Sequence, residues 1–209
     1  MLIKNKPINI SEVLDDAKPK GVIHCGAFIG EELPIYQSHG IDNRCWIEAD
    51  PDTFTKLKEL IPQDDVALNV AVSDYVGVGS FVVMNNGASS SLLVPKRHLD
   101  FYPEIQPIKE IWVDVRTLDF LVECGRIDMS KYDFLYMDLQ GGEMDALKGF
   151  EEHIDEINFI LAEINYEELY EGCALIDEFD AYLKERGFEK QWATIHEAVG
   201  WGDAYYKRV

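Results

Sequence analysis

Short apolar runs alternate with segments of helical periodicity along most of the 209-residue chain, and this alternation constrains the fold more than any other feature. Apolar runs bounded like buried strands and separated by helices are typical of a parallel sheet that helices cover on both faces. The predicted strands are residues 21–25, 44–48, 66–70, 79–84, 109–115, 134–138, 157–163, 188–195 and 203–208. The predicted helices are residues 11–17, 31–39, 51–61, 117–124, 143–148 and 175–186. The sequence therefore predicts an α/β fold, with residues 1–20 as an N-terminal helical extension and residues 21–209 as one domain.

The chain is strongly acidic, with 39 acidic and 19 basic residues and a formal net charge of −20. Such a surface repels phosphate backbones, so we expect no nucleic-acid partner. No apolar stretch has the length of a signal peptide or a membrane span, so we expect no membrane span. The four cysteines are scattered and form no CxxC pair, which fits a reducing compartment. We therefore expect a cytoplasmic protein.

Residues 22–32, VIHCGAFIGEE, place two glycines where the first buried strand turns into its helix. In parallel sheets, ligands bind beyond the carboxyl ends of the strands, where the strand order reverses. Gly26 and Gly30 would let the backbone approach a ligand there, because no Cβ occupies the space. The GxxxG spacing is also common in helix packing, and it lacks the third glycine of the dinucleotide-binding pattern GxGxxG.

Glu48 closes the second predicted strand in WIEADP. A carboxylate at this place can accept hydrogen bonds from both hydroxyls of an adenosine ribose. The alternative is one more surface acid in an acidic chain. The glycine turn and Glu48 together indicate a nucleoside cofactor, and they leave nicotinamide dinucleotide and S-adenosylmethionine both open.

Polar side chains follow the strands 134–138 and 157–163, in MDLQGGE and AEINYEE. Side chains alternate along a strand, so Asp138 shares a face with Gln140, and Glu163 shares a face with Asn165. If the two strands are neighbours, these four groups converge at the carboxyl edge of the sheet. Capping of the helix 143–148 is the alternative explanation for Asp138 and Gln140.

The ordered set of motifs resembles the FkbM-type S-adenosylmethionine-dependent methyltransferases. The motifs are VIHCGAFIGEE, WIEADPDTF, NVAVSDYVG, SSSLL, RTLDFL, YMDLQGGEMDALKG, EINYEELYEGC and GWGDAYY, and they span about residues 21–207. The resemblance implies a Rossmann-like class I methyltransferase fold, with a seven-stranded, mostly parallel sheet whose last strand is antiparallel. It also implies methyl transfer to oxygen, on a hydroxyl of a sugar or glycan.

The resemblance further implies a set of cofactor-binding residues around S-adenosyl-L-methionine. The glycine turn would approach its methionine part, Glu48 its ribose, and residues 69–73 its adenosine. The expected cofactor-binding residues are His24, Gly26, Ala27, Gly30, Glu31, Glu48, Ala49, Asp50, Ala71, Val72, Ser73, Asp138 and Gln140.

The reaction centre would contain Asp138, Glu163 and Asn165, with His24 as a further catalytic candidate. Many family members carry aspartate where this chain has His24, which would contact the methionine end, act as a base, or pack in the core. Asp138 or Glu163 would remove the proton of the acceptor hydroxyl. Alternatively, the oxygens of Asp138, Glu163 and Asn165 would hold Mg²⁺, so the metal requirement stays open.

Residues 85–108 form a long stretch without clear periodicity, which indicates an acceptor-binding loop or lid. A disordered surface loop is the alternative. The final hairpin would form a second wall if residues 188–195 run parallel to the core strands, although Trp201 would equally serve to anchor the turn by packing. The expected substrate-binding residues are Ser90, Ser91, Arg97, Tyr102, His196 and Trp201.

Two other functions compete with methyl transfer at this level. An NAD-dependent oxidoreductase is favoured by the glycine turn and Glu48 alone, and a non-catalytic nucleoside-binding module would keep the fold without chemistry. A nucleic-acid methyltransferase is disfavoured, because MDLQ stands where amino-group methylation uses a DPPY-like signature. The acceptor and the oligomeric state stay open.

Overall fold

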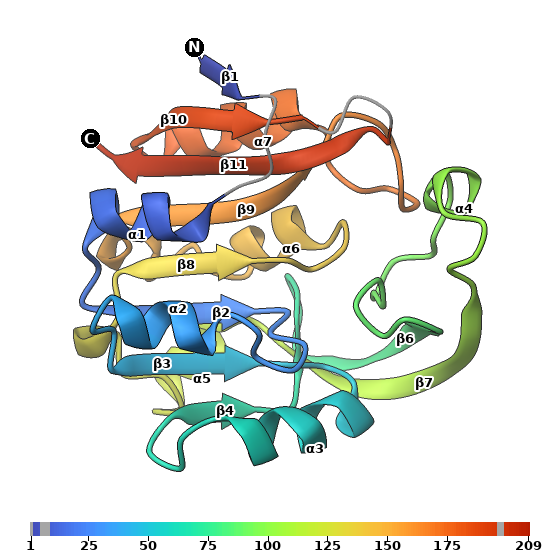
Figure 1. Ribbon diagram of the computed structural model, residues 1–209, viewed down its shortest axis with the longest axis horizontal. Coiled ribbons are helices and arrows are strands. Elements are labelled where there is room, and N and C mark those ends of the chain that lie inside the picture. Colours follow the sequence, from blue (N-terminus) through green and yellow to red (C-terminus); the bar gives the residue numbers. More distant parts are fainter. Residues whose placement is uncertain (1, 5–8, 196–198) are drawn as a thin grey trace.

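The computed structural model describes residues 2–4, 9–195 and 199–209. Within these residues, eight strands form the main sheet in the order β1-β10-β11-β9-β8-β2-β3-β4 (Figure 1). Their bounds are β1 Leu2–Lys4, β2 Gly21–Cys25, β3 Asn43–Ile47, β4 Val66–Leu68, β8 Phe134–Met137, β9 Phe159–Asn165, β10 Phe188–Thr194 and β11 Trp201–Arg208.

The direction of the strands confirms the predicted topology. Strands β4, β3, β2, β8 and β9 pair in parallel, and β11 runs antiparallel between β9 and β10. These seven strands match the predicted sheet. The sequence pattern missed β1, which adds a parallel edge strand beside β10.

Helices cover both faces of the sheet (Figure 1). One face packs against α1, α2 and α3, whose side chains join Val22, Trp46 and Phe134 in one apolar cluster. The other face packs against α5, α6 and α7, in a cluster that contains Ile23 and Leu135. The helices are α1 Ile10–Ala17, α2 Leu33–Ser38, α3 Pro51–Leu60, α4 His98–Phe101, α5 Leu118–Glu123, α6 Glu143–Lys148 and α7 Ile176–Glu185, with short 3₁₀ turns at Met129–Lys131 and Ile154–Glu156. No helix in the described part of the chain is long and apolar enough to cross a membrane.

Helix starts follow the side chains that can cap them. Asp50 caps α3, because its carboxylate accepts a hydrogen bond from the Thr53 amide, and Pro51 follows as the first helical residue. The helix predicted over residues 11–17, with Ser11 as its expected N-cap, begins one residue earlier, so the expected cap is wrong by two residues. Asn9 caps α1 instead, with its side chain accepting from the Ser11 amide.

A three-stranded sheet, β5-β7-β6 among the described residues, lies beyond the carboxyl ends of the parallel strands (Figure 1). Its strands are β5 Ala71–Val72, β6 Gly77–Met84 and β7 Pro107–Arg116. β6 and β7 pair antiparallel, at the two segments predicted as strands. The predicted strand 66–70 is shorter than expected: β4 ends at Leu68, and the chain leaves the main sheet to form β5 on β7.

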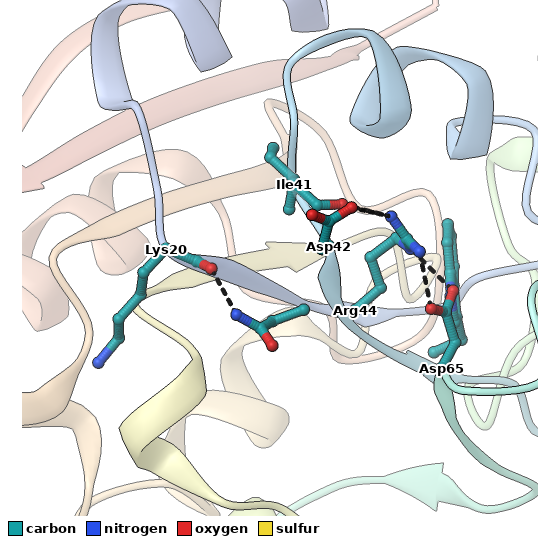
Figure 2. Close-up of polar contacts among 7 residues, drawn as sticks. Lys20, Ile41, Asp42, Arg44 and Asp65 are labelled. Carbon is teal, nitrogen blue, oxygen red and sulfur yellow. Dashed lines mark hydrogen bonds and ion pairs between the residues drawn. The ribbon is translucent and has the colours of Figure 1, made fainter.

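A buried ion pair ties β3 to the segment before β4 (Figure 2). Arg44 Nε donates to Asp65 Oδ2 over 2.8 Å, and Arg44 Nη2 donates to Asp65 Oδ1 over 2.9 Å. The indole of Trp46 also donates to Asp65 Oδ2, at 2.8 Å. Arg44 Nη1 donates to the Ile41 carbonyl. These four hydrogen bonds give both buried charges polar partners inside the core, which is what their burial requires.

Candidate functional site

The chain order of the main sheet reverses between β2 and β8, and the glycine turn lies at this point. A Cβ at Gly26 would lie 1.8 Å from the carbonyl oxygen of Asp138, and Gly26 has a φ of +79°. Both observations require glycine here. The turn after β2 therefore packs directly against the turn after β8, at the place where ligands bind in sheets of this kind.

A first cleft opens beside this turn. Residues at the ends of β2, β3 and β8 line this cleft, together with Phe81 and residues of the segment 87–92. Its walls are largely apolar, with the carboxylates of Glu48 and Asp138 among them. The lining residues are Gly26, Phe28, Ile47, Glu48, Ala49, Val70, Ala71, Val72, Phe81, Gly87, Ala88, Ser90, Leu92, Asp138, Leu139 and Gly142.

Glu48 is held in the wall of the first cleft by the backbone. Its Oε2 accepts from the Phe28 amide at 2.9 Å, and its Oε1 accepts from the Asp50 amide at 2.8 Å. Burial raises the pKa of Glu48 to about 7, against the opposing effect of these amides. Each carboxylate oxygen can accept a second hydrogen bond, so the side chain is oriented and still able to bind a pair of hydroxyls.

A second cleft adjoins the first, at the ends of β8, β9 and β11. Asp138 and Ala88 line both clefts, so these two residues lie at the junction. The second cleft combines aromatic rings with acids and an amide. Its lining residues are Ala88, Ser89, His98, Tyr102, Ile105, Asp138, Gln140, Glu163, Leu169, Tyr170 and Trp201.

Gln140 connects the polar groups of the second cleft. Its amide nitrogen lies 2.7 Å from Asp138 Oδ1 and 3.2 Å from Glu163 Oε2. Its amide oxygen accepts from the hydroxyl of Tyr170 at 2.6 Å. The side chain therefore spans from β8 to β9 and fixes two carboxylates and a tyrosine relative to one another, as the predicted convergence of strand ends requires.

The acids of this region are buried close together. Burial raises the pKa of Asp138 and the pKa of Glu163, and their mutual repulsion raises that of Glu163 further. Asp203 pairs with Glu163 across β11 and β9, and burial followed by repulsion from Asp138 raises the pKa of Asp203 to about 7. No group of three or more His, Cys, Asp or Glu side chains in the described ranges is arranged to hold a metal ion.

The segment 85–108 is an ordered wall of both clefts, and it contains α4. The backbone amides of Lys96 and His98 donate to the Leu169 carbonyl, and the Glu171 amide donates to the Val94 carbonyl. The indole of Trp201 donates to the Tyr102 hydroxyl at 3.0 Å. Figure 1 shows the same arrangement, with α4 beside the loop that follows β9. The wall is thus attached to the loop after β9 and to the start of β11.

Many of the predicted site residues line these clefts. In the first cleft are Gly26, Glu48, Ala49, Ala71, Val72 and Asp138, and in the second are Asp138, Gln140, Glu163, Tyr102 and Trp201. Ser90 was expected at the acceptor and lines the first cleft instead. The remaining predicted residues, Ala27, Gly30, Glu31, Asp50, Ser73, Ser91 and Arg97, line neither cleft. His196 lies outside the described residues.

Two predicted catalytic side chains lie away from the clefts. His24 is buried in β2, hydrogen-bonded to the Tyr36 hydroxyl at 3.2 Å and stacked on Tyr136, and burial lowers its pKa to about 3. It therefore occupies the place of a packed core histidine, one of the alternatives given by the sequence. Asn165 is buried at the end of β9 and lines neither cleft.

Several residues that line the clefts were not predicted from the sequence as site residues. Phe28 and Leu139 stand between predicted residues, and Tyr170 and His98 belong to loops whose folding the apolar pattern does not specify. Tyr170 belongs to the motif EINYEELYEGC, and His98 belongs to the basic run Lys96-Arg97-His98. These patterns indicated the two segments but did not identify Tyr170 or His98 as site residues.

A mostly parallel sheet with antiparallel β11 beside β9 and a cleft at its switch point is the architecture of class I, S-adenosylmethionine-dependent methyltransferases. The fold is similar to that of magnesium protoporphyrin IX methyltransferase (ChlM) from Synechocystis PCC 6803 with bound S-adenosylmethionine. The TM-score is 0.50 at 10% sequence identity, over 96% of this chain and 76% of that one.

The chain belongs to the FkbM methyltransferase family, because the model of the methyltransferase FkbM domain matches residues 24–190. A curated relative, the 2-O-methyltransferase NoeI from Sinorhizobium fredii (strain NBRC 101917 / NGR234), is 33% identical over 134 residues. The match covers 60% of this chain and 54% of the relative, so it spans about half the length of that protein. The family prediction made from the motifs is confirmed.

Proposed function

We propose that the chain transfers a methyl group from S-adenosylmethionine to a hydroxyl of a sugar or glycan. The observation that carries the proposal is the position of Asp138, a residue that lines both the first and the second cleft. A group at that junction can contact a cofactor on one side and an acceptor on the other. The name of the relative NoeI, a 2-O-methyltransferase, supports transfer to oxygen.

The first cleft fits the adenosine and methionine parts of the cofactor. Phe28, Val72 and Leu139 offer apolar surface of the kind that an adenine ring packs against. The Glu48 carboxylate, oriented by two backbone amides, would bind the ribose hydroxyls. At Gly26 the absence of a Cβ would let the methionine part approach the backbone. The bound cofactor supplies an electrophilic methyl group on a sulfonium.

The second cleft has the composition of a sugar site. Tyr102, Tyr170 and Trp201 provide ring surfaces for the apolar face of a sugar, while Gln140 and Glu163 provide polar groups for its hydroxyls. A pocket of this kind binds a neutral polyol more readily than an anion, because it contains buried acids and lies in a chain with a net charge of −20.

Asp138 would accept the proton of the attacking hydroxyl. Its raised pKa makes it a stronger base than an exposed aspartate once it is ionised. Gln140 donates to Asp138 Oδ1 and so fixes the direction of the carboxylate. Glu163, one strand away, would orient a neighbouring hydroxyl of the acceptor.

The residues do not fit the predicted Mg²⁺ site. Asp138 and Glu163 direct one oxygen each at the same amide nitrogen of Gln140, and Asn165 lines neither cleft. A hydrogen-bond donor thus occupies the place between the two carboxylates where a shared cation would lie. Family membership likewise favours methyl transfer over the NAD-dependent alternative.

The proposal is tested by incubating the protein with S-adenosylmethionine and the methyl glycosides of glucose, galactose, fucose, rhamnose and N-acetylglucosamine, with and without EDTA. Mass spectrometry should detect one added methyl group on at least one glycoside, at the same rate in both conditions. If every glycoside stays unmethylated while S-adenosylhomocysteine binds, the sugar assignment is wrong. A rate abolished by EDTA and restored by Mg²⁺ would overturn the metal-free scheme.

A further inference from the structure

The imidazole of His98 lines the second cleft and has no role in the proposed methyl transfer. His98 is the first residue of α4, its side chain is only 5% exposed, and it lines the second cleft together with Asp138 and Glu163. The sequence analysis selected its neighbour Arg97 as a substrate-binding residue and not His98 itself. Its place opposite the acids makes it part of the wall that an acceptor would meet.

One ring nitrogen of His98 has no hydrogen-bond partner among the described residues. That nitrogen, Nδ1, is buried. Buried polar groups in proteins are nearly always hydrogen-bonded, so an unpartnered imidazole in the lining of a cleft is a candidate for contact with a bound molecule. A neutral imidazole carries its proton on either Nδ1 or Nε2, and a hydrogen bond at one nitrogen normally decides which. Because Nδ1 has no such bond, Nε2 can act either as a donor or as an acceptor.

The neighbouring hydroxyls are already engaged. Tyr102, whose ring centroid lies 5.1 Å from that of His98, accepts a hydrogen bond from Trp201 through its hydroxyl. Tyr170, at 5.4 Å, donates its hydroxyl hydrogen to Gln140. Both rings contact the imidazole, and the His98 amide donates to the Leu169 carbonyl. Tyr102 keeps its hydroxyl hydrogen as a donor, and His98 is the ring of the three with a buried polar atom that has no partner among the described residues.

We infer that His98 is an acceptor-binding residue whose imidazole forms a hydrogen bond with one hydroxyl of the sugar, next to the hydroxyl that is methylated. The inference rests on the proposed function. Burial lowers the pKa of His98, so the ring is neutral at neutral pH and carries one donor and one acceptor nitrogen. A neutral ring between two tyrosines suits a neutral polyol, and the contact would select sugars by the presence and orientation of that hydroxyl.

Three variants separate hydrogen bonding from packing. His98→Phe keeps a ring between Tyr102 and Tyr170 and removes both nitrogens. His98→Gln and His98→Asn each restore an amide close to one ring nitrogen. His153→Phe, at a histidine that pairs with Glu156 on the surface, is the matched control. Binding of S-adenosylhomocysteine, measured by calorimetry, reports that the fold and the first cleft are intact.

The decisive measurement uses the methyl glycoside that the wild type methylates and its mono-deoxy analogues. The His98→Phe variant should lose about 10- to 100-fold in kcat/KM, mainly through KM, and His98→Gln or His98→Asn should recover much of it. One deoxy analogue should be poor for the wild type and no worse than the parent sugar for His98→Phe, because the same hydrogen bond is absent in both.

Full activity of His98→Phe, or equal losses on every deoxy analogue in the wild type and in His98→Phe, would overturn the role of His98 while leaving the proposed function standing. A wild type that methylates none of the glycosides overturns the proposed function, and the inference with it. Unchanged S-adenosylhomocysteine binding together with loss of one hydroxyl preference supports it.

Discussion

Gln140 holds Asp138 by a hydrogen bond of 2.7 Å between its amide nitrogen and Oδ1, and the same nitrogen lies 3.2 Å from Glu163 Oε2. Gln140 has a φ of +54°, in the left-handed region that non-glycine residues adopt rarely. The turn after β8 thus accepts an unfavourable backbone conformation at the residue that fixes both carboxylates. Conformations of this kind are frequent at functional sites.

Replacing this amide should slow the reaction without weakening cofactor binding. Gln140→Met keeps the length of the side chain and removes the hydrogen bonds to both carboxylates, so kcat should fall about 10- to 100-fold. S-adenosylhomocysteine affinity should stay within about two-fold, because Gln140 lines the second cleft and not the first. Gln191→Met, on the exposed side of β10, is the control. Wild-type turnover by Gln140→Met would contradict the orienting role.

Asp138→Asn should remove the proton acceptor while keeping the shape of the side chain. We expect kcat to fall about 10²- to 10⁴-fold, the usual contribution of a positioned base. Burial raises the pKa of Asp138, and only its ionised form is a base, so wild-type activity should decline as the pH falls through a value above the ordinary 3.8. Steady-state rates from pH 4.5 to 8.5 measure both effects, with exposed Asp177→Asn as control. Full activity of Asp138→Asn would exclude Asp138 as the base.

Glu48→Gln should weaken cofactor binding. The carboxylate would bind two ribose hydroxyls, and its amide replacement also loses one acceptor for the Phe28 or Asp50 backbone amide. The dissociation constant of S-adenosylhomocysteine should rise about 10- to 100-fold by calorimetry, whereas Glu59→Gln on the exposed face of α3 should leave it unchanged. A thermal melt distinguishes lost contacts from lost structure. Unchanged affinity would remove Glu48 from the ribose site.

The sequence predicted the parts of this protein that depend on local pattern. Apolar runs and helical periodicity located β2, β3, β8, β9 and α3, because both patterns are set by residues a few positions apart. The topological rule for parallel sheets then placed Asp138 and Glu163 at one edge, and the clefts contain both. The position of Glu48 followed from the same rule.

The errors come from contacts between distant segments. His24 stands near the end of its strand in the sequence, but its side chain is held in the core by contacts with Tyr36 and Tyr136 from other segments. His98 and Tyr170 form one wall only because the segment around α4 pairs with the loop after β9 through backbone hydrogen bonds. No local pattern of hydrophobicity encodes such a pairing.

Breaking the buried ion pair of Arg44 and Asp65 should strongly reduce the free energy of unfolding (Figure 2). Asp65→Asn leaves the buried guanidinium of Arg44 without its charge partner, and we expect a loss of about 3–5 kcal/mol in the free energy of unfolding. Asp52→Asn breaks an exposed pair with Lys109 and should leave the midpoint of urea unfolding nearly unchanged. The double variant Arg44→Met/Asp65→Leu should recover much of the loss. Equal midpoints for Asp65→Asn and Asp52→Asn would contradict the importance of burial.

The protein without ligand should become less stable as the pH rises from about 5 to 8. Burial raises the pKa of Glu48 from 4.5 to about 7, and that of Asp203 from 3.8 to about 7. Between its two pKa values each carboxyl group keeps its proton in the folded state and releases it in the unfolded state, so it lowers the free energy of unfolding by about 1.4 kcal/mol per pH unit. Below the ordinary histidine pKa of 6.5, the buried His24, whose pKa is lowered to about 3, acts in the opposite direction and offsets one of the two carboxyl groups. The net charge of −20 acts in the same direction. Urea unfolding at pH 5.5, 6.5 and 7.5 measures the slope, which Asp203→Asn should reduce and exposed Asp177→Asn should not. Stability that rises over this range, or a slope unaffected by Asp203→Asn, would show that these carboxyl groups are ionised in the folded protein.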